Sequence, residues 1–284
     1  MTKHFEGHFK GFDKTELFFQ SWNNKDNNKA IIVSHGIGEH SGSYEPFART
    51  MVDFGWNVLS FDHRGHGRSD GQRGYVKSFD EFEKDLYQFI SLVQKEHPEY
   101  KHLVLFGHSM GGLIASKTII AYGQQGLMAL VLSAPAWGLS LDAPEWKKKA
   151  AHYLKKYLPR LTLDNEINNE DLTRDPEFLA GFDKDPLRHN KISPRLYMGM
   201  LDSFDQIPHF LPEIKLPVLV QISETDPIIN AKIVIENFEK IGSNIKRLKT
   251  YKNNKHEIYN DIERDLVFKD LNEFLNELLS NNVL

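Results

Sequence analysis

Short apolar runs alternate with longer helical patterns along most of the chain, and this alternation restricts the fold more than any other feature. The runs in the middle of the chain are continuously apolar, which is typical of parallel strands that helices cover on both faces. Strands that alternate with helices predict an α/β sheet with right-handed crossover connections. Apolar residues alternate within 5–9 and 17–22, which predicts an antiparallel hairpin on the edge of that sheet. The other expected strands cover residues 30–34, 57–61, 102–106, 129–133, 218–222 and 245–251.

The segments between these strands space their apolar residues as helices do. One pattern starts at Ser78, where Glu81 three positions later suggests a capping box, and it ends before Pro98. Residues 110–122 are apolar on nearly every side, which predicts a buried helix. A last helix is expected over 262–279. Its apolar side carries Leu266, Leu271, Phe274, Leu275 and Leu278.

Residues 137–213 interrupt the alternation between two expected strands. The segment is polar, helical in pattern and rich in proline, and it contains no convincing strand. An insertion at such a point most simply forms a cap over the edge of the sheet. We therefore expect residues 1–136 and 214–284 to form the core and residues 137–213 to form an inserted helical cap.

The composition excludes several classes of protein. The chain of 284 residues has a net charge of −4, whereas a domain that binds nucleic acid usually carries a large basic excess. It contains no cysteine, which excludes disulfide scaffolds, thiolate metal sites and cysteine nucleophiles. No window approaches the ~20 apolar residues of a membrane span, and the N-terminus does not resemble a signal peptide. We expect a cytoplasmic protein without a metal or cofactor; the sequence does not indicate its oligomeric state.

The pattern Gly-x-Ser-x-Gly occurs twice, around Ser109 and around Ser69. In a sharp turn from a strand into a helix, this pattern lifts the serine hydroxyl above the carboxyl edge of a sheet, where it can act as a nucleophile. Ser109 directly follows the expected strand 102–106 and opens the apolar helix 110–122. Ser69 lies among loop residues, where it gains neither a helix N-terminus nor a fixed exposure. The context therefore selects Ser109 and predicts that Ser69 is an ordinary turn residue.

A nucleophilic serine needs a base that removes its proton, and histidine is suited to this near neutral pH. In the strand–turn–helix arrangement the chain order is Ser, then Asp or Glu, then His. His256 is the only histidine after Asp226, and it lies in a polar loop that follows the expected strand 245–251. The order therefore selects His256 as the base.

The acid that orients this histidine is expected to be Asp226. It follows the expected strand 218–222, so its carboxylate would lie at the same edge of the sheet as the serine. Glu224 is the nearest alternative, and an Asp before a proline can also be a simple turn residue. Asp202 and Asp205 are weaker candidates because they precede the strand.

Acyl transfer also needs hydrogen-bond donors for the oxyanion of the tetrahedral intermediate. The backbone N–H of Met110, directly after the nucleophile, is one candidate. The second is the N–H of Ile37, which two glycines flank in the loop after the expected strand 30–34; a merely flexible turn is the alternative. His35 is expected to brace this loop. The later residues Asp62, Arg64 and His66 indicate a hydrogen-bonded turn rather than a metal site.

Taken together, these segments resemble the monoacylglycerol lipase and bacterial lysophospholipase branch of the α/β-hydrolases. The likeness covers nearly the whole chain, and the first-loop motif and the serine motif together are much more specific than Gly-x-Ser-x-Gly alone. The matching segments are residues 35–42, 61–69, 107–112, 172–176, 185–187, 223–226 and 255–257. One departure is Ser43, where monoacylglycerol lipases commonly carry an arginine. The cap is also less apolar than that of the mammalian enzyme.

The resemblance implies an α/β-hydrolase fold, a catalytic triad of Ser109, Asp226 and His256, and a mobile cap over an acyl pocket. It implies an ester hydrolase that cleaves single-chain acyl lipids, either monoacylglycerols or lysophospholipids, through an acyl-enzyme. We expect Trp137, Leu139 and Leu141 at the start of the cap to line the acyl pocket. A small-ester carboxylesterase, a serine peptidase of the same fold and a binding protein without catalysis are the alternatives.

The cap contains one strongly amphipathic segment. Its lysines lie opposite an apolar side, a pattern that can rest on an anionic lipid surface and give peripheral membrane contact. The competing interpretation, which we favour, is that the apolar side packs on the core and the lysines are solvated. The apolar residues are Trp146, Ala150, Tyr153, Leu154, Tyr157, Leu158 and Leu161.

Overall fold

The computed structural model describes residues 3–24, 27–140 and 144–280. Its main sheet has eight strands in the order β1-β2-β4-β3-β5-β6-β9-β10, and all pairs from β4 to β10 are parallel. The expected hairpin forms one edge of the sheet, where β1 pairs antiparallel with β2. The strands are β1 (Lys3–Lys10), β2 (Glu16–Asn23), β3 (Lys29–Ser34), β4 (Asn57–Phe61), β5 (His102–His108), β6 (Ala129–Ser133), β9 (Val218–Ser223) and β10 (Lys246–Tyr251).

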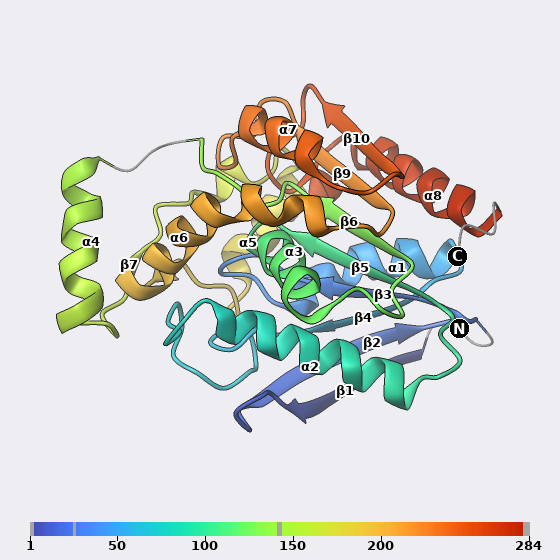
Figure 1. The fold of residues 1–284 in the computed structure, drawn as a ribbon, viewed down its shortest axis with the longest axis horizontal. Coiled ribbons are helices and arrows are strands. Elements are labelled where there is room, and N and C mark those ends of the chain that lie inside the picture. Colours follow the sequence, from blue (N-terminus) through green and yellow to red (C-terminus); the bar gives the residue numbers. More distant parts are fainter. Residues whose placement is uncertain (1–2, 25–26, 141–143, 281–284) are drawn as a thin grey trace.

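Two hydrophobic clusters lie on opposite faces of this sheet, as the continuous apolar runs of its strands predict. One cluster joins the sheet to α2 (Asp80–Glu96), α3 (Met110–Tyr122) and α7 (Ala231–Lys240). The other joins it to α1 (Glu45–Asp53) and α8 (Arg264–Ser280). Figure 1 shows the resulting three-layer arrangement of helix, sheet and helix. The predicted fold class is confirmed.

Two helical details differ from the sequence-based expectation. Helix α2 begins at Asp80 rather than Ser78, and the carboxylate of Glu81 accepts a hydrogen bond from the backbone N–H of Lys77, so the expected capping box does not form. On α8, Leu266 is half exposed although the other apolar residues of its stripe are buried. The next two residues, Val267 and Phe268, are buried instead, so the buried side of the first turn is centred on them and not on Leu266.

The insertion between β6 and β9 contains α4 (Glu145–Tyr157), α5 (Pro176–Lys184) and α6 (Pro194–Phe210). It also contains a small antiparallel pair of strands, β7 (Leu163–Asp164) and β8 (Lys191–Ile192), that the sequence did not suggest. Two-residue strands carry too little periodicity to be read from a sequence. Helix α6 buries Leu196, Met200 and Ile207 in the same cluster as the core helices α2 and α3.

Helix α4 stands at the far end of the insertion, away from the sheet (Figure 1). The favoured interpretation of its apolar side is wrong: Trp146, Tyr153 and Tyr157 are 67%, 67% and 68% exposed, and only Ala151 of the helix is buried. We call these three residues the aromatic stripe. Helix α4 packs against α6, and the aromatic stripe stays largely exposed beside that contact. Among the described helices, none is long and apolar enough to cross a membrane.

Candidate active site

Ser109 lies in the turn that joins β5 to α3, as its motif predicts. Its backbone has a positive φ of 52°, a strained conformation for a residue with a side chain. A Cβ on Gly111 would lie 2.1 Å from the carbonyl oxygen of Ser34, and one on Gly107 would lie 2.6 Å from that of Gly111. Only glycine fits at either position. The flanking glycines therefore let the helix approach the sheet closely while the turn presents Ser109 at the carboxyl edge.

Asp226 and His256 meet at the same edge because they follow the adjacent parallel strands β9 and β10. The carboxylate Oδ2 of Asp226 lies 2.8 Å from Nδ1 of His256, and both residues are buried. The other carboxylate oxygen accepts hydrogen bonds from the backbone N–H groups of Ile228 and Ile229, at 2.8 and 2.9 Å. The alternative acid, Glu224, is exposed and accepts a hydrogen bond from Thr250 instead.

The pairing shifts both ionisation equilibria toward the charged forms. Burial alone would raise the pKa of Asp226, but the charge of His256 and the hydrogen bonds to the carboxylate outweigh it and lower that pKa. Burial alone would lower the pKa of His256, but the Asp226 carboxylate outweighs it and raises that pKa above its ordinary value. The carboxylate therefore stabilises an imidazolium at this position.

Ser109 and His256 line one cavity of about 490 Å³, together with Ile37. No hydrogen bond joins the Ser109 hydroxyl to the His256 ring within the described residues, and such contacts often tighten only when substrate binds. The backbone N–H groups of Ile37 and Met110 donate to no protein acceptor in the described ranges. Both amides are therefore free to donate to a ligand oxygen near Ser109.

The sequence matches, over residues 25–263, the model of a family described as serine aminopeptidase, S33. The chain belongs to this family. It is 32% identical over 280 residues to the monoglyceride lipase of Homo sapiens, an alignment that covers 95% of this chain and 90% of the relative. It is 28% identical over 278 residues to the monoacylglycerol lipase of Mycolicibacterium smegmatis, with 95% and 96% of the two chains covered. The crystal structure of Paleococcus ferrophilus monoacylglycerol lipase is 27% identical, with a TM-score of 0.80 and 97% and 99% covered.

These relatives confirm the resemblance inferred from the motifs, and with it the α/β-hydrolase fold. In this S33-family chain the insertion forms the roof of the Ser109 cavity. The roof is polar, with several asparagine and acidic side chains between β7 and β8. The residues of the insertion that line the cavity are Asp164, Asn165, Ile167, Asn168, Asn169, Glu170, Leu172, Phe182, Asp183, Asp185, Arg188, His189 and Asn190.

Of the expected acyl-pocket residues, Trp137 and Leu139 do not line this cavity. Trp137 is buried in the hydrophobic cluster that α2 and α3 share, and Leu139 is half buried where it pairs with Ile229. Leu141 lies outside the described residues. The backbone beside Trp137 is nevertheless close in space to the nucleophile, because the N–H of Ala136 donates to the backbone carbonyl of Ser109 at 2.9 Å.

Sequence reasoning missed a buried charged cluster beside the cavity. Arg188, from the insertion, forms an ion pair of 2.9 Å with Glu257, the residue after the base. Glu39, in the loop of Ile37, accepts hydrogen bonds from the N–H of Gly36 and from the hydroxyl of Tyr44. Burial and the nearby Glu257 raise the pKa of Glu39 to about 7. Glu39 and Glu257 lie in the matching segments 35–42 and 255–257, but the sequence gives no sign that an arginine from the insertion joins them.

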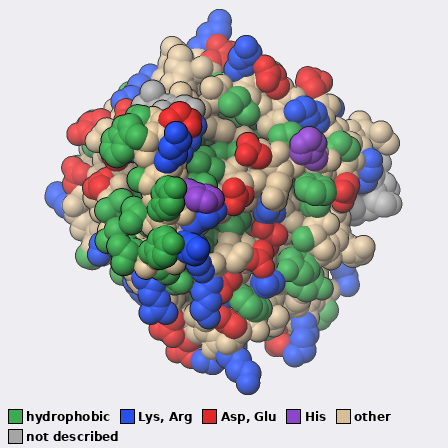
Figure 2. All heavy atoms as spheres, turned by 60° about the vertical axis from the view of Figure 1, so that its left-hand side comes forward, with side chains coloured by type: hydrophobic (Ala, Val, Ile, Leu, Met, Phe, Trp, Pro, Cys, Tyr) green, Lys and Arg blue, Asp and Glu red, His purple; other side chains and the backbone are tan. Residues whose placement is uncertain are grey.

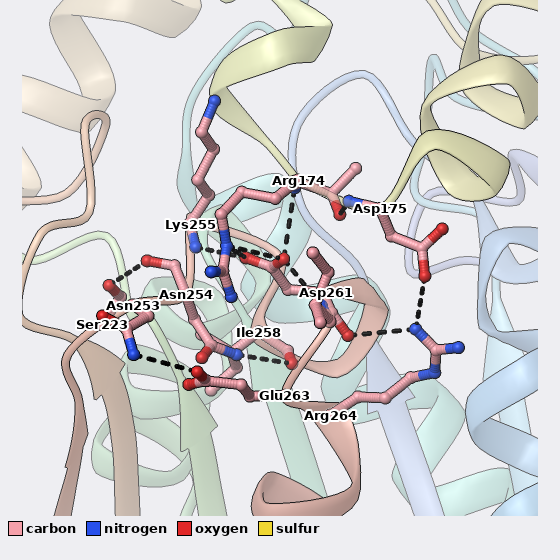
Figure 3. Close-up of polar contacts among 12 residues, drawn as sticks. Arg174, Asp175, Ser223, Asn253, Asn254, Lys255, Ile258, Asp261, Glu263 and Arg264 are labelled. Atoms are coloured by element: carbon pink, nitrogen blue, oxygen red, sulfur yellow. Dashed lines mark hydrogen bonds and ion pairs between the residues drawn. The ribbon is translucent and has the colours of Figure 1, made fainter.

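A second network holds the loop of His256 against the insertion (Figure 3). The buried carboxylate of Asp261 accepts hydrogen bonds from the N–H of Lys255 and from the N–H and side chain of Arg174. The outer partners Arg264 and Asp175 form an ion pair of 2.6 Å. In addition, the N–H of Glu257 donates to the carbonyl of Leu172 at 2.8 Å. The loop that carries the histidine is therefore fixed by the first residues that lead into α5.

The remaining residues singled out in the sequence have structural roles. The Ser69 hydroxyl is buried, accepts from the N–H of Phe18 and donates to the carbonyl of Asp62, so it is a turn residue. Nε2 of His35 accepts a hydrogen bond from the N–H of His63, which braces the loop as expected. Arg64 pairs with Asp85. No group of side chains suited to hold a metal ion occurs among the described residues.

Proposed function

We propose that this chain is a serine ester hydrolase that cleaves single-chain acyl lipids, a monoacylglycerol or a lysophospholipid, and releases a fatty acid. The observation that carries the proposal is the buried pair of Asp226 and His256 at the cavity that Ser109 lines. Relatives that are named monoglyceride and monoacylglycerol lipases, aligned over nearly the whole chain, support the substrate class.

In the proposed mechanism, Nε2 of His256 removes the proton of Ser109 as its oxygen attacks the ester carbonyl carbon. The carbon–oxygen bond to the alcohol then breaks, and the alcohol oxygen takes the proton from His256. Water attacks the resulting acyl-serine with the same base, which releases the fatty acid and restores the serine. The pKa of His256, raised by Asp226, suits a group that must both accept and return this proton.

The backbone N–H groups of Ile37 and Met110 are proposed to bind the oxyanion. Within the described part of the chain neither N–H donates to a protein acceptor, and Met110 is also the first residue of α3, whose dipole favours negative charge at this end. One such donor typically contributes about 3 kcal/mol to the stabilisation of the transition state.

Residues 137–213 are proposed to act as a cap on a core of residues 1–136 and 214–284. The acyl chain would lie in the Ser109 cavity between the two, where the insertion contributes the apolar side chains of Ile167, Leu172 and Phe182. Each buried methylene contributes about 0.8 kcal/mol, so catalytic efficiency should rise with chain length until the pocket is full.

The test is a hydrolysis panel of p-nitrophenyl esters of graded length, monoacylglycerols, lysophosphatidylcholine and aminoacyl amides. The proposal predicts that medium or long monoacyl esters are cleaved better than acetate esters or amides. Best turnover of acetate esters would make the chain a small-ester carboxylesterase, and best turnover of amides would make it a peptidase. A fluorophosphonate probe that fails to label Ser109 would indicate a binding protein.

We also propose that the protein is cytoplasmic and that its cap makes peripheral contact with a membrane surface. The aromatic stripe of α4 supports this, because Trp and Tyr favour the interface between lipid and water. Leu158, Leu161 and Leu163 extend the exposed apolar surface beyond the helix. Figure 2 shows hydrophobic side chains gathered on one part of this face, with lysines and arginines beside them. Substrate drawn from a bilayer would then reach the cavity beneath the insertion.

A further inference from the structure

A groove of about 650 Å³ lies between the start of α2, helix α4 and helix α6, apart from the Ser109 cavity. Its volume is in the range of small-molecule sites. The aromatic stripe borders it, since Tyr153 and Tyr157 contribute to its wall. We call it the cap groove. Its lining residues are Lys77, Ser78, Phe79, His152, Tyr153, Lys155, Lys156, Tyr157, Arg195, Met198, Gly199 and Asp202.

Among its described lining residues, the cap groove has an excess of positive charge. Lys77, Lys155, Lys156 and Arg195 line it, whereas Asp202 is the single acidic residue among the described lining residues. None of the four cations forms an ion pair with any described side chain. Other lysines of α4 differ in this respect, because Lys147 pairs with Glu166 and Lys148 pairs with Glu145.

The acidic residues nearest to the groove in the chain are already engaged elsewhere. Asp80 pairs with Lys84 at 2.6 Å, and Glu81 pairs with Arg64 at 3.4 Å. Neither carboxylate is therefore free to neutralise the groove. An anion that entered the groove would meet four cationic side chains and the single carboxylate of Asp202.

Arg195 gives the groove a fixed geometry. Its guanidinium donates to the backbone carbonyl of Lys77, on the core side, and to that of Lys155, on α4, at 3.2 and 3.3 Å. One side chain thus ties together the two walls that carry the lysines. Lys77 and Lys155, which contribute to the positive charge of the groove, are thus held on its two walls by one guanidinium.

We propose that the cap groove binds the phosphate of an anionic phospholipid head group. Lysine and arginine are the residues that bind phosphate oxygens in proteins, through charge-assisted hydrogen bonds. The adjoining aromatic stripe would lie against the acyl region of the same leaflet. This continuity between a basic groove and an apolar border fits a lipid in a bilayer better than a soluble phosphate. The proposal rests on the membrane contact proposed above and adds a specific site to it.

The experiment measures sedimentation of the protein with vesicles of phosphatidylcholine alone or mixed with phosphatidylglycerol. The Ser109→Ala protein is used so that no lipid is hydrolysed, and physiological salt screens charges more than about 8 Å apart. Lys77→Gln with Lys156→Gln should weaken binding to the anionic vesicles by about a hundredfold, roughly tenfold for each lost phosphate contact. Binding to the neutral vesicles should not change.

Lys149→Gln is the matched control, because Lys149 is exposed on the same helix, forms no ion pair with a described residue and does not line the groove. It should weaken binding by less than about fivefold, the loss expected for a lysine in a merely diffuse attraction. Equal losses per charge for Lys77 and Lys149 would overturn the groove and leave only diffuse attraction.

Two further arms separate the related hypotheses. Trp146→Ala should weaken binding to both kinds of vesicle. If the Ser109→Ala protein without further changes binds neither kind of vesicle, the proposed lipid site and the proposed membrane contact are both overturned. If millimolar glycerol phosphate binds in a way that needs Lys77 while anionic vesicles do not, the ligand is a soluble phosphate and the lipid assignment is overturned. Turnover of a soluble p-nitrophenyl ester by Lys77→Gln protein with Ser109 intact should stay unchanged, which separates this site from the proposed catalysis.

Discussion

Nδ1 of His256 and Oδ2 of Asp226 lie 2.8 Å apart, in a contact that is buried from solvent. The carboxylate accepts a hydrogen bond from Nδ1–H, which leaves the opposite ring nitrogen to act as a base. The two residues follow the adjacent parallel strands β9 and β10, whose pairing brings their loops to the same edge of the sheet. The sheet thus brings the acid and the base to one edge, and the contacts of Lys255 and Glu257 hold the loop of His256 there.

Asp226→Asn should reduce kcat for a soluble ester by about four decades, as the equivalent change does in serine proteases. An amide cannot stabilise the imidazolium, and it favours the wrong tautomer of the ring. Glu224→Gln is the matched control, since Glu224 is exposed two positions away, and it should change kcat less than about twofold. Steady-state kinetics on purified variants decide between them. A larger loss in the Glu224 variant would reassign the acid.

The pH profile should report the same pair. Catalysis needs neutral His256, so kcat/KM for a soluble ester should rise with pH and reach half its maximum above the ordinary histidine value of 6.5, because Asp226 raises the pKa. In Asp226→Asn protein, the ring loses the charge that chiefly opposes burial, so its pKa falls relative to the wild type although Glu257 and Glu39 still raise it. The residual activity should therefore reach half its maximum at a lower pH than in the wild type. A shift in the opposite direction would contradict the assigned coupling.

Ser109→Ala and Ser69→Ala should separate chemistry from structure. Loss of the Ser109 hydroxyl should reduce kcat by several decades without lowering the free energy of unfolding. Loss of the Ser69 hydroxyl leaves the buried N–H of Phe18 without its acceptor and should cost about 1–3 kcal/mol of stability while kcat stays within a fewfold. Urea unfolding and ester kinetics on both variants test this. A severe loss of kcat in a stable Ser69→Ala protein would contradict the assignment of Ser69 as a turn residue.

The core and the arrangement of its polar residues could be predicted because they depend on local patterns. Continuous apolar runs mark the buried parallel strands, and the carboxyl ends of those strands bring Ser109, Asp226 and His256 to one edge. The glycines around Ser109 indicate the tight turn directly. Each of these features depends on a short segment of the sequence, so it can be predicted without knowledge of tertiary contacts.

The insertion could not be predicted in the same way, because its structure depends on tertiary contacts. The amphipathic pattern of α4 is real, yet the helix turns Ala151 rather than the aromatic stripe toward α6. Periodicity gives the sides of a helix but does not say which side a neighbour covers. The ion pair between Arg188 and Glu257 joins residues 69 positions apart and leaves no local signal.

Glu39→Gln should make stability less dependent on pH. The buried Glu39 has a pKa of about 7, above the 4.5 of an exposed glutamate, so it favours folding while protonated, and this contribution is lost as the pH rises through about 7. A glutamine cannot ionise and can still accept from Gly36 and Tyr44. The wild type should lose a few degrees of melting temperature relative to the variant between about pH 5 and about pH 8. If the melting temperatures of the two proteins change by the same amount over this pH range, Glu39 does not titrate in it.

Asp261 should connect the stability of the insertion with the position of the base. Asp261→Asn removes a buried charge that accepts from both Lys255 and Arg174, which should cost about 3 kcal/mol of stability because the Arg174 guanidinium loses its partner. The loop of His256 then loses the contact that fixes the residue directly before the base, so kcat for a soluble ester should fall at least tenfold with little change in KM. Asp175→Asn is the control, since it breaks only the outer, partly exposed pair with Arg264 and should cost about 1 kcal/mol or less. If both variants lose stability but keep full kcat, the network supports the fold and does not position His256.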